Sequence, residues 1–199
     1  DYQVEFRNIL MEINSGLDFR QWVDIYRKII GWELKLDASN TTALGDILSM
    51  QKSEANAEFS RFVAKNYEGW MSGDIEAPTL SPNLMRTKVF PAMKDNVPTI
   101  MLLLDNLRYD QWKTIEPILS QFFRVEEEDF FYSTLPTTTQ YSRNSIFAGL
   151  TPLEIQEYYP EWWKNDVDDG GKNLHEQDLL AEQIRRTFRK EIKHEYIKI

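Results

Sequence analysis

The chain has 199 residues, 42% hydrophobic and 13% aromatic, with 23 basic and 32 acidic side chains for a net charge of −9. This composition supports one or two folded domains and argues against a protein that coats nucleic acid, which needs clustered lysine and arginine. There is no cysteine, which excludes disulfides and cysteine-bound zinc. With only His175 and His194, the chain alone cannot supply a histidine-rich metal site. No apolar run reaches the roughly 20 residues of a membrane helix. We therefore expect no membrane insertion.

Residues 1–71 have the apolar periodicity of helices, and we predict that they form a three-helix bundle. Asp18 is the expected N-cap of the second helix. Trp22, Trp32 and Trp70 can be read either as a ligand cage or as aromatic core. An apolar stripe left over on such a bundle would allow a homodimer. The apolar residues at helical spacing are Phe19, Trp22, Val23, Tyr26, Ile29, Ile30 and Leu34, then Leu44, Ile47, Leu48, Ala55, Phe59, Phe62, Val63 and Trp70.

Residues 72–95 break this periodicity. Pro78, Pro82 and Pro91 disfavour a continuous helix, and apolar residues such as Leu84 and Val89 lie between them. We predict an extended connector that packs on a surface.

Residues 96–199 alternate between strand and helix patterns. The apolar run 99–104 is typical of a parallel strand buried on both faces, and 130–134 and 195–199 are further candidates. Helices are expected near 110–121, 139–148 and 179–190. This order predicts the first part of a doubly wound α/β domain with right-handed crossovers. The overall expectation is an N-terminal helical bundle followed by this α/β domain.

Asp105 follows directly on the predicted strand 99–104. In doubly wound sheets, functional sites form beyond the carboxyl ends of the strands. The carboxylate is thus well placed to bind a divalent cation. Position alone equally allows Asp105 to cap the next helix.

Residues 135–149 place a proline and three threonines immediately before a helix of small residues. The free N–H groups at a helix N-terminus bind anions such as phosphate. A hydroxyl on that first turn can attack a phosphoryl group if a metal lowers its pKa. Taken alone, the pattern also fits an ordinary threonine N-cap.

Together these two features resemble the alkaline phosphatase superfamily. Its phosphodiesterases have an Asp after a buried strand and then a Pro-Thr/Ser-x-Thr segment leading into a small helix that ends in glycine. Residues 105–110 (Asp-Asn-Leu-Arg-Tyr-Asp) and 138–150 (Thr-Thr-Gln-Tyr-Ser-Arg-Asn-Ser-Ile-Phe-Ala-Gly-Leu) look like the PglZ domain. A three-helix bundle before a PglZ domain resembles the PorX-type response regulators of Bacteroidetes.

The resemblance implies a zinc-dependent phosphodiesterase or phosphatase. Thr139 takes the position of the nucleophile, with Thr138 as the alternative if the register shifts by one residue. Asp105 and Thr139 would bind one of two zinc ions, and the remaining ligands are expected beyond residue 199. Arg108 and Arg143 are candidates for phosphate contacts, or for ordinary ion pairs.

The resemblance also implies a two-component response regulator with a receiver domain before Asp1, linked to type IX protein secretion. The expected partners are a sensor kinase, secretion-regulatory proteins and a phosphoester substrate, such as a nucleotide or short oligonucleotide. We expect a cytoplasmic protein of which this chain is an incomplete, inactive piece. The alternative is a non-catalytic signalling and dimerisation module with a degenerate hydrolase fold.

Overall fold

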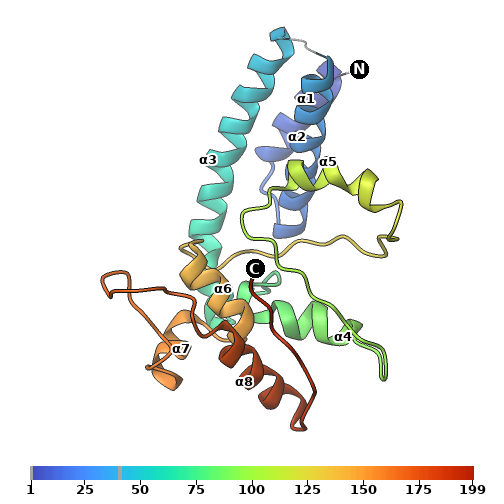
Figure 1. Ribbon diagram of the computed structural model, residues 1–199. Helices are drawn as coiled ribbons and strands as arrows, with labels where there is room; N and C mark the ends of the chain where they lie inside the picture. The colour runs from blue at the N-terminus through green and yellow to red at the C-terminus, as the bar shows by residue number, and fades with distance from the viewer. Residues whose placement is uncertain (1, 40–41) are drawn as a thin grey trace. The chain divides into compact units, whose positions relative to one another are not determined.

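The computed structural model describes residues 2–39 and 42–199 and divides the chain into two compact units (Figure 1). Unit 1 contains the described part of residues 1–78 together with 106–129. Unit 2 contains residues 79–105 and 130–199. None of the helices within the described ranges is both long and apolar enough to cross a membrane.

Unit 1 is built on three helices: α1 (Tyr2–Ile13), α2 (Phe19–Ser39) and α3 (Thr42–Ser72), which pack against one another (Figure 1). Asp18 caps α2 as predicted, since its Oδ1 accepts the N–H groups of Arg20 at 2.8 Å and Gln21 at 2.9 Å. The buried side chains recur at helical spacing, so each helix turns its apolar face to a shared core. That core contains Phe6, Ile9, Ile13, Leu17, Trp22, Ile25, Ile29, Leu48 and Ala55.

Unit 1 also includes helix α5 (Tyr109–Leu119) and the segment that follows it. Glu128 anchors this segment. Its carboxylate accepts hydrogen bonds from Tyr109 Oη (2.9 Å), Trp112 Nε1 (3.1 Å) and Lys113 Nζ (3.0 Å), and Arg27 Nη2 of α2 lies 3.6 Å away. Partial burial opposes ionisation, but these donors outweigh it and lower the pKa of Glu128 below its usual value. A segment from the second half of the sequence is thereby tied to α2.

Unit 2 is helical in the residues described. Its core joins α6 (Thr139–Ala148), α7 (Pro152–Tyr158) and α8 (Glu176–Phe188), and α6 and α8 lie side by side (Figure 1). Where the sequence predicts an extended connector, the chain forms a 3₁₀ turn (Ser81–Asn83), a π-helical turn (Met85–Val89) and α4 (Phe90–Ala92). The buried apolar residues of unit 2 include Met85, Phe90, Ile146, Phe147, Ala148, Ile155, Trp163, Leu179 and Ile184.

The doubly wound α/β sheet is not confirmed, because the described residues contain no strand. Their only β-bridge is an isolated parallel one between Leu80 and Tyr132. In the predicted strand 99–104, alternate residues pack on the helical core, but Ile100 and Leu102 are 82% and 81% exposed. The reason is physical: a strand exists only where a neighbouring strand completes its hydrogen bonds. An apolar run alone does not supply that neighbour.

Gly149 ends α6 in a left-handed conformation, with φ at +63°. A Cβ added there would lie 2.7 Å from Cδ of the buried Gln183 of α8. We expect Gly149→Ala to lower the free energy of unfolding by about 1–3 kcal/mol, measured by urea denaturation. The matched control is Gly31→Ala in α2, where an added Cβ meets no described atom within 4 Å. That change should stabilise by about 0.5–1 kcal/mol. Equal effects of the two substitutions would contradict this account of Gly149.

Candidate functional site

The candidate site lies at the N-terminus of α6. Thr138 is the N-cap, with extended backbone (φ −66°, ψ 149°), and Thr139 is the first helical residue. The observed helix has the bounds that the sequence predicts. Thr139 therefore stands where the unpaired N–H groups of the first turn point out of the helix. This is a favourable place for an anion.

Asp105 lies beside Thr139. The Thr139 hydroxyl Oγ1 is 3.3 Å from Asp105 Oδ2 and donates to it. The alternative role of Asp105 as a helix cap is wrong, because α5 begins at Tyr109 and its N-cap is Arg108. The side chain of Asp105 remains 38% exposed, so its carboxylate is open to solvent.

Arg143 lies one turn after Thr139 and on the same face of α6. Its Nη1 is 3.1 Å from Asp105 Oδ2, and its Nη2 is 2.6 Å from Glu176 Oε2. Burial lowers the pKa of Arg143, but the two carboxylates outweigh this effect and raise it overall. Arg143 is thus a fixed positive charge beside Asp105.

Glu176 is a residue that sequence reasoning missed. It is the first residue of α8 and is only 1% exposed. In the sequence it looks like an ordinary acidic residue near a helix start, and no local pattern marks it as buried. Tyr196 also donates to Glu176 Oε2, and burial together with this bond raises the pKa of Tyr196 to about 12.

An amide network holds the N-terminal half of α6 in place. Asn173 Nδ2 donates to the backbone oxygen of Thr139 at 3.2 Å and to Asn144 Oδ1 at 3.0 Å. Asn144 in turn donates to the backbone oxygen of Lys172 at 3.1 Å, and Gln140 donates to that of Lys164. Asn144 and Gln140 are both buried. Thr139 is therefore presented by a rigid support.

The other predicted site residues are placed differently. Arg108 pairs with Asp110 through Nε (3.0 Å) and Nη2 (2.7 Å) and belongs to unit 1. Thr138 makes no side-chain capping bond within the described residues. The roles of Thr139, Thr138, Asp105, Arg108 and Arg143 stay predictions.

The donor set at this site suits a divalent cation only in part. Asp105 and Thr139 offer two oxygen ligands side by side, a type that zinc and magnesium accept. Across residues 2–39 and 42–199 no group of three or more His, Cys, Asp or Glu gathers to complete a site. His175 is engaged with Asp178 (Nδ1 to Oδ2, 2.9 Å), and its ring stacks on Trp162.

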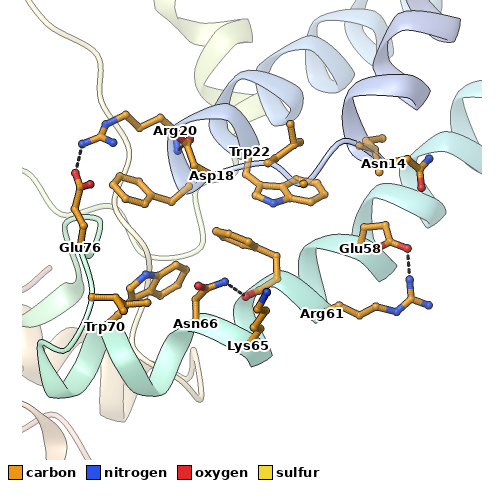
Figure 2. A pocket seen from close by; sticks show the side chains of 16 residues that line it. Asn14, Asp18, Arg20, Trp22, Glu58, Arg61, Lys65, Asn66, Trp70 and Glu76 are labelled. Carbon is orange, nitrogen blue, oxygen red and sulfur yellow. Dashed lines mark hydrogen bonds and ion pairs between the residues drawn. The ribbon is translucent and has the colours of Figure 1, made fainter.

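A hollow of about 720 Å³ lies in unit 1 (Figure 2). It is lined by the end of α1, the loop to α2, the start of α2, the second half of α3 and the loop after α3. Trp22 and Trp70 line it, whereas Trp32 packs against Phe6. The Trp22 indole nitrogen has no partner among the described residues, but it also has no accessible surface. A ligand therefore could not reach this nitrogen without opening the bundle. The aromatic ring of Trp22 packs on that of Phe59, with ring centroids 5.3 Å apart. This packing favours the interpretation of Trp22 as a core residue over that of a ligand cage.

Comparison with protein families identifies the two parts of the chain. Residues 84–197 match an alkaline phosphatase-like domain, and residues 1–71 match the linker domain of the PorX response regulator. The alkaline phosphatase-like match is to the PglZ domain of BREX systems; it covers more than half of the chain, and the chain belongs to that family. The resemblance drawn from the sequence to a PorX-like PglZ-domain protein is confirmed. Comparison with curated proteins gives no match.

Proposed function

We propose that the intact protein is a metal-dependent phosphodiesterase or phosphatase whose hydrolase domain is joined to a response-regulator linker. The observation that carries this proposal is the convergence of Thr139 Oγ1, Asp105 Oδ2 and the Arg143 guanidinium at the N-terminus of α6. A hydroxyl, a carboxylate and a fixed positive charge at a helix N-terminus are the components that phosphoryl transfer needs. The PglZ match supports the same chemistry.

In the proposed reaction, Thr139 Oγ1 attacks phosphorus and gives up its proton to solvent, while the bond from phosphorus to the ester oxygen breaks and that oxygen takes up a proton from water and leaves as the alcohol. Water then attacks the phosphorus of the phosphothreonine, the bond from phosphorus to Oγ1 breaks, and the phosphate product leaves as Thr139 regains its proton. Asp105 orients the hydroxyl by accepting its hydrogen bond, and Arg143 and the first N–H groups of α6 offset the negative charge on the phosphoryl oxygens. A divalent cation, for which we propose zinc, would be held by Asp105 and Thr139 and would lower the pKa of that hydroxyl.

For the biological setting we propose a regulator that acts in type IX protein secretion, inside the cell and downstream of a sensor kinase. The match of residues 1–71 to the linker domain of the PorX response regulator, next to an alkaline phosphatase-like domain, supports the regulator part of this proposal. We propose a nucleotide or short oligonucleotide as substrate. The net charge of −9 disfavours long polyanions.

Metal removal tests the proposal. The intact protein should hydrolyse bis-p-nitrophenyl phosphate, lose this activity in EDTA and regain it with zinc. Asp105→Asn should lower both zinc affinity and turnover by about 10²-fold or more, because it removes the charged ligand. The matched control is Asp169→Asn, the same chemical change at an exposed loop residue, which should leave both unchanged.

Hydrolysis that survives EDTA, or an Asp105→Asn variant with normal zinc affinity, would refute the metal-dependent site. A protein that folds and binds zinc but hydrolyses no phosphoester would instead favour the non-catalytic signalling module.

A further inference from the structure

The buried carboxylate of Glu176 is not used by the proposed reaction. A charge removed from water is costly unless it is paired. Glu176 is 1% exposed, and the bonds it makes converge on Oε2: from Arg143 Nη2 at 2.6 Å and from the Tyr196 hydroxyl, with Lys198 Nζ 3.8 Å away. Oε1 is buried without a partner among the described residues.

Arg143 is shared between two carboxylates. Nη1 binds Asp105 Oδ2 and Nη2 binds Glu176 Oε2, while Nε is buried with no partner in the described part of the chain. A guanidinium binds a carboxylate most strongly through two parallel N–H groups. Here each carboxylate receives one hydrogen bond from Arg143. The guanidinium therefore bridges Asp105 and Glu176 and forms a two-bond ion pair with neither of them.

We infer that Glu176 is a positioning residue of the phosphoryl-transfer site, which holds Arg143 back from full pairing with Asp105. This inference rests on the proposed function. While Glu176 holds Nη2, Asp105 keeps negative charge and lone pairs for a cation. The Nη1 edge of Arg143 meanwhile stays beside Thr139, where an oxyanion of the substrate would lie.

The charges around the pair set the direction of the effect. The charged and titratable groups in contact with Arg143 and Glu176 are Asp105, Lys198 and Tyr196. If the charge of Glu176 were removed, Asp105 would be the remaining anionic partner of Arg143 among these groups. The guanidinium would then close on Asp105 through two N–H groups and neutralise it. A cation would bind there less tightly.

The test is the zinc affinity of the intact protein, measured by competition with a chromophoric chelator. Glu176→Gln keeps the shape of the side chain and should weaken zinc binding by about 10–100-fold. Arg143→Met should tighten zinc binding, because it removes the competing positive charge. The matched control is Tyr196→Phe, which removes the hydrogen bond from the Tyr196 hydroxyl to Oε2 but leaves the ion pair between Arg143 and Glu176. It should not change zinc affinity.

The double variant Glu176→Gln/Arg143→Met removes both buried charges and so avoids leaving one unpaired. It should bind zinc as tightly as Arg143→Met alone, because Glu176 acts only through Arg143. Unchanged zinc affinity in Glu176→Gln, or an equal loss with Arg143 absent, would overturn the positioning role. Zinc binding that is insensitive to Asp105→Asn would instead overturn the proposed function, and this inference with it.

Discussion

Thr139→Ala is expected to abolish zinc-dependent phosphodiester hydrolysis, with a fall in kcat of at least about 10³-fold. Alanine removes the only oxygen that donates to Asp105 from the first turn of α6 among the described residues. The variant should stay folded, since Thr139 is held through its backbone oxygen by Asn173. Turnover of bis-p-nitrophenyl phosphate by the intact protein, with circular dichroism to verify folding, measures the effect.

Two variants sharpen the assignment. Thr139→Ser keeps a hydroxyl and should retain a large part of the activity. Thr138→Ala removes the neighbouring hydroxyl, which makes no capping bond within the described residues, and should leave kcat within about threefold. Loss of activity in Thr138→Ala with activity retained in Thr139→Ala would move the nucleophile to Thr138. Equal activity in both alanine variants and the wild type would refute a threonine nucleophile here.

Trp22→Ala should be strongly destabilising, lowering the free energy of unfolding by about 3–5 kcal/mol. The indole of Trp22 is 5% exposed and packs in edge contact with Phe59 at 5.3 Å and against Phe62 at 6.0 Å. Alanine would leave a cavity in the core of the bundle. Urea denaturation followed by far-ultraviolet circular dichroism measures the change.

Trp22→Phe tests the hypothesis that Trp22 stabilises the bundle as a core residue. Phenylalanine keeps an aromatic ring and removes a buried N–H that has no partner among the described residues, so its cost should be well below that of alanine. Met50→Ala in α3 is the control for an exposed site, since Met50 is 74% exposed, and it should change stability by less than about 0.5 kcal/mol. A Trp22→Ala variant as stable as the wild type would show that the bundle core lies elsewhere.

Local sequence was sufficient to predict the longer helices of both halves, but not α7 or the short helical turns between Ser81 and Ala92. Periodicity in 19–39 and 42–72 reflects one apolar face per helix, and Asp18 caps through its own side chain. The bounds of α6 were predicted because Thr138 and Gly149 are themselves the end signals. Such features depend on a few neighbouring residues, which the sequence displays directly.

The extended segments were harder to predict, because a strand depends on residues distant in sequence. The run 99–104 has the composition of a buried strand, yet the described residues offer it no neighbouring strand with which to form a ladder, and Leu102 is exposed. The attachment of α5 to α2 through Glu128 was also not foreseen, since nothing local to Glu128 indicates that Arg27 will approach it.

By itself the sequence determined the longer helices, the family and the threonine and aspartate proposed for the reaction. Only the tertiary structure decided that Arg143 stands between Asp105 and a buried Glu176. The physical reason is the distance along the chain over which each interaction acts. Capping and helical periodicity act within one or two turns, whereas the sharing of one guanidinium by residues 105 and 176 depends on how α6, α8 and the segment before Asp105 pack together.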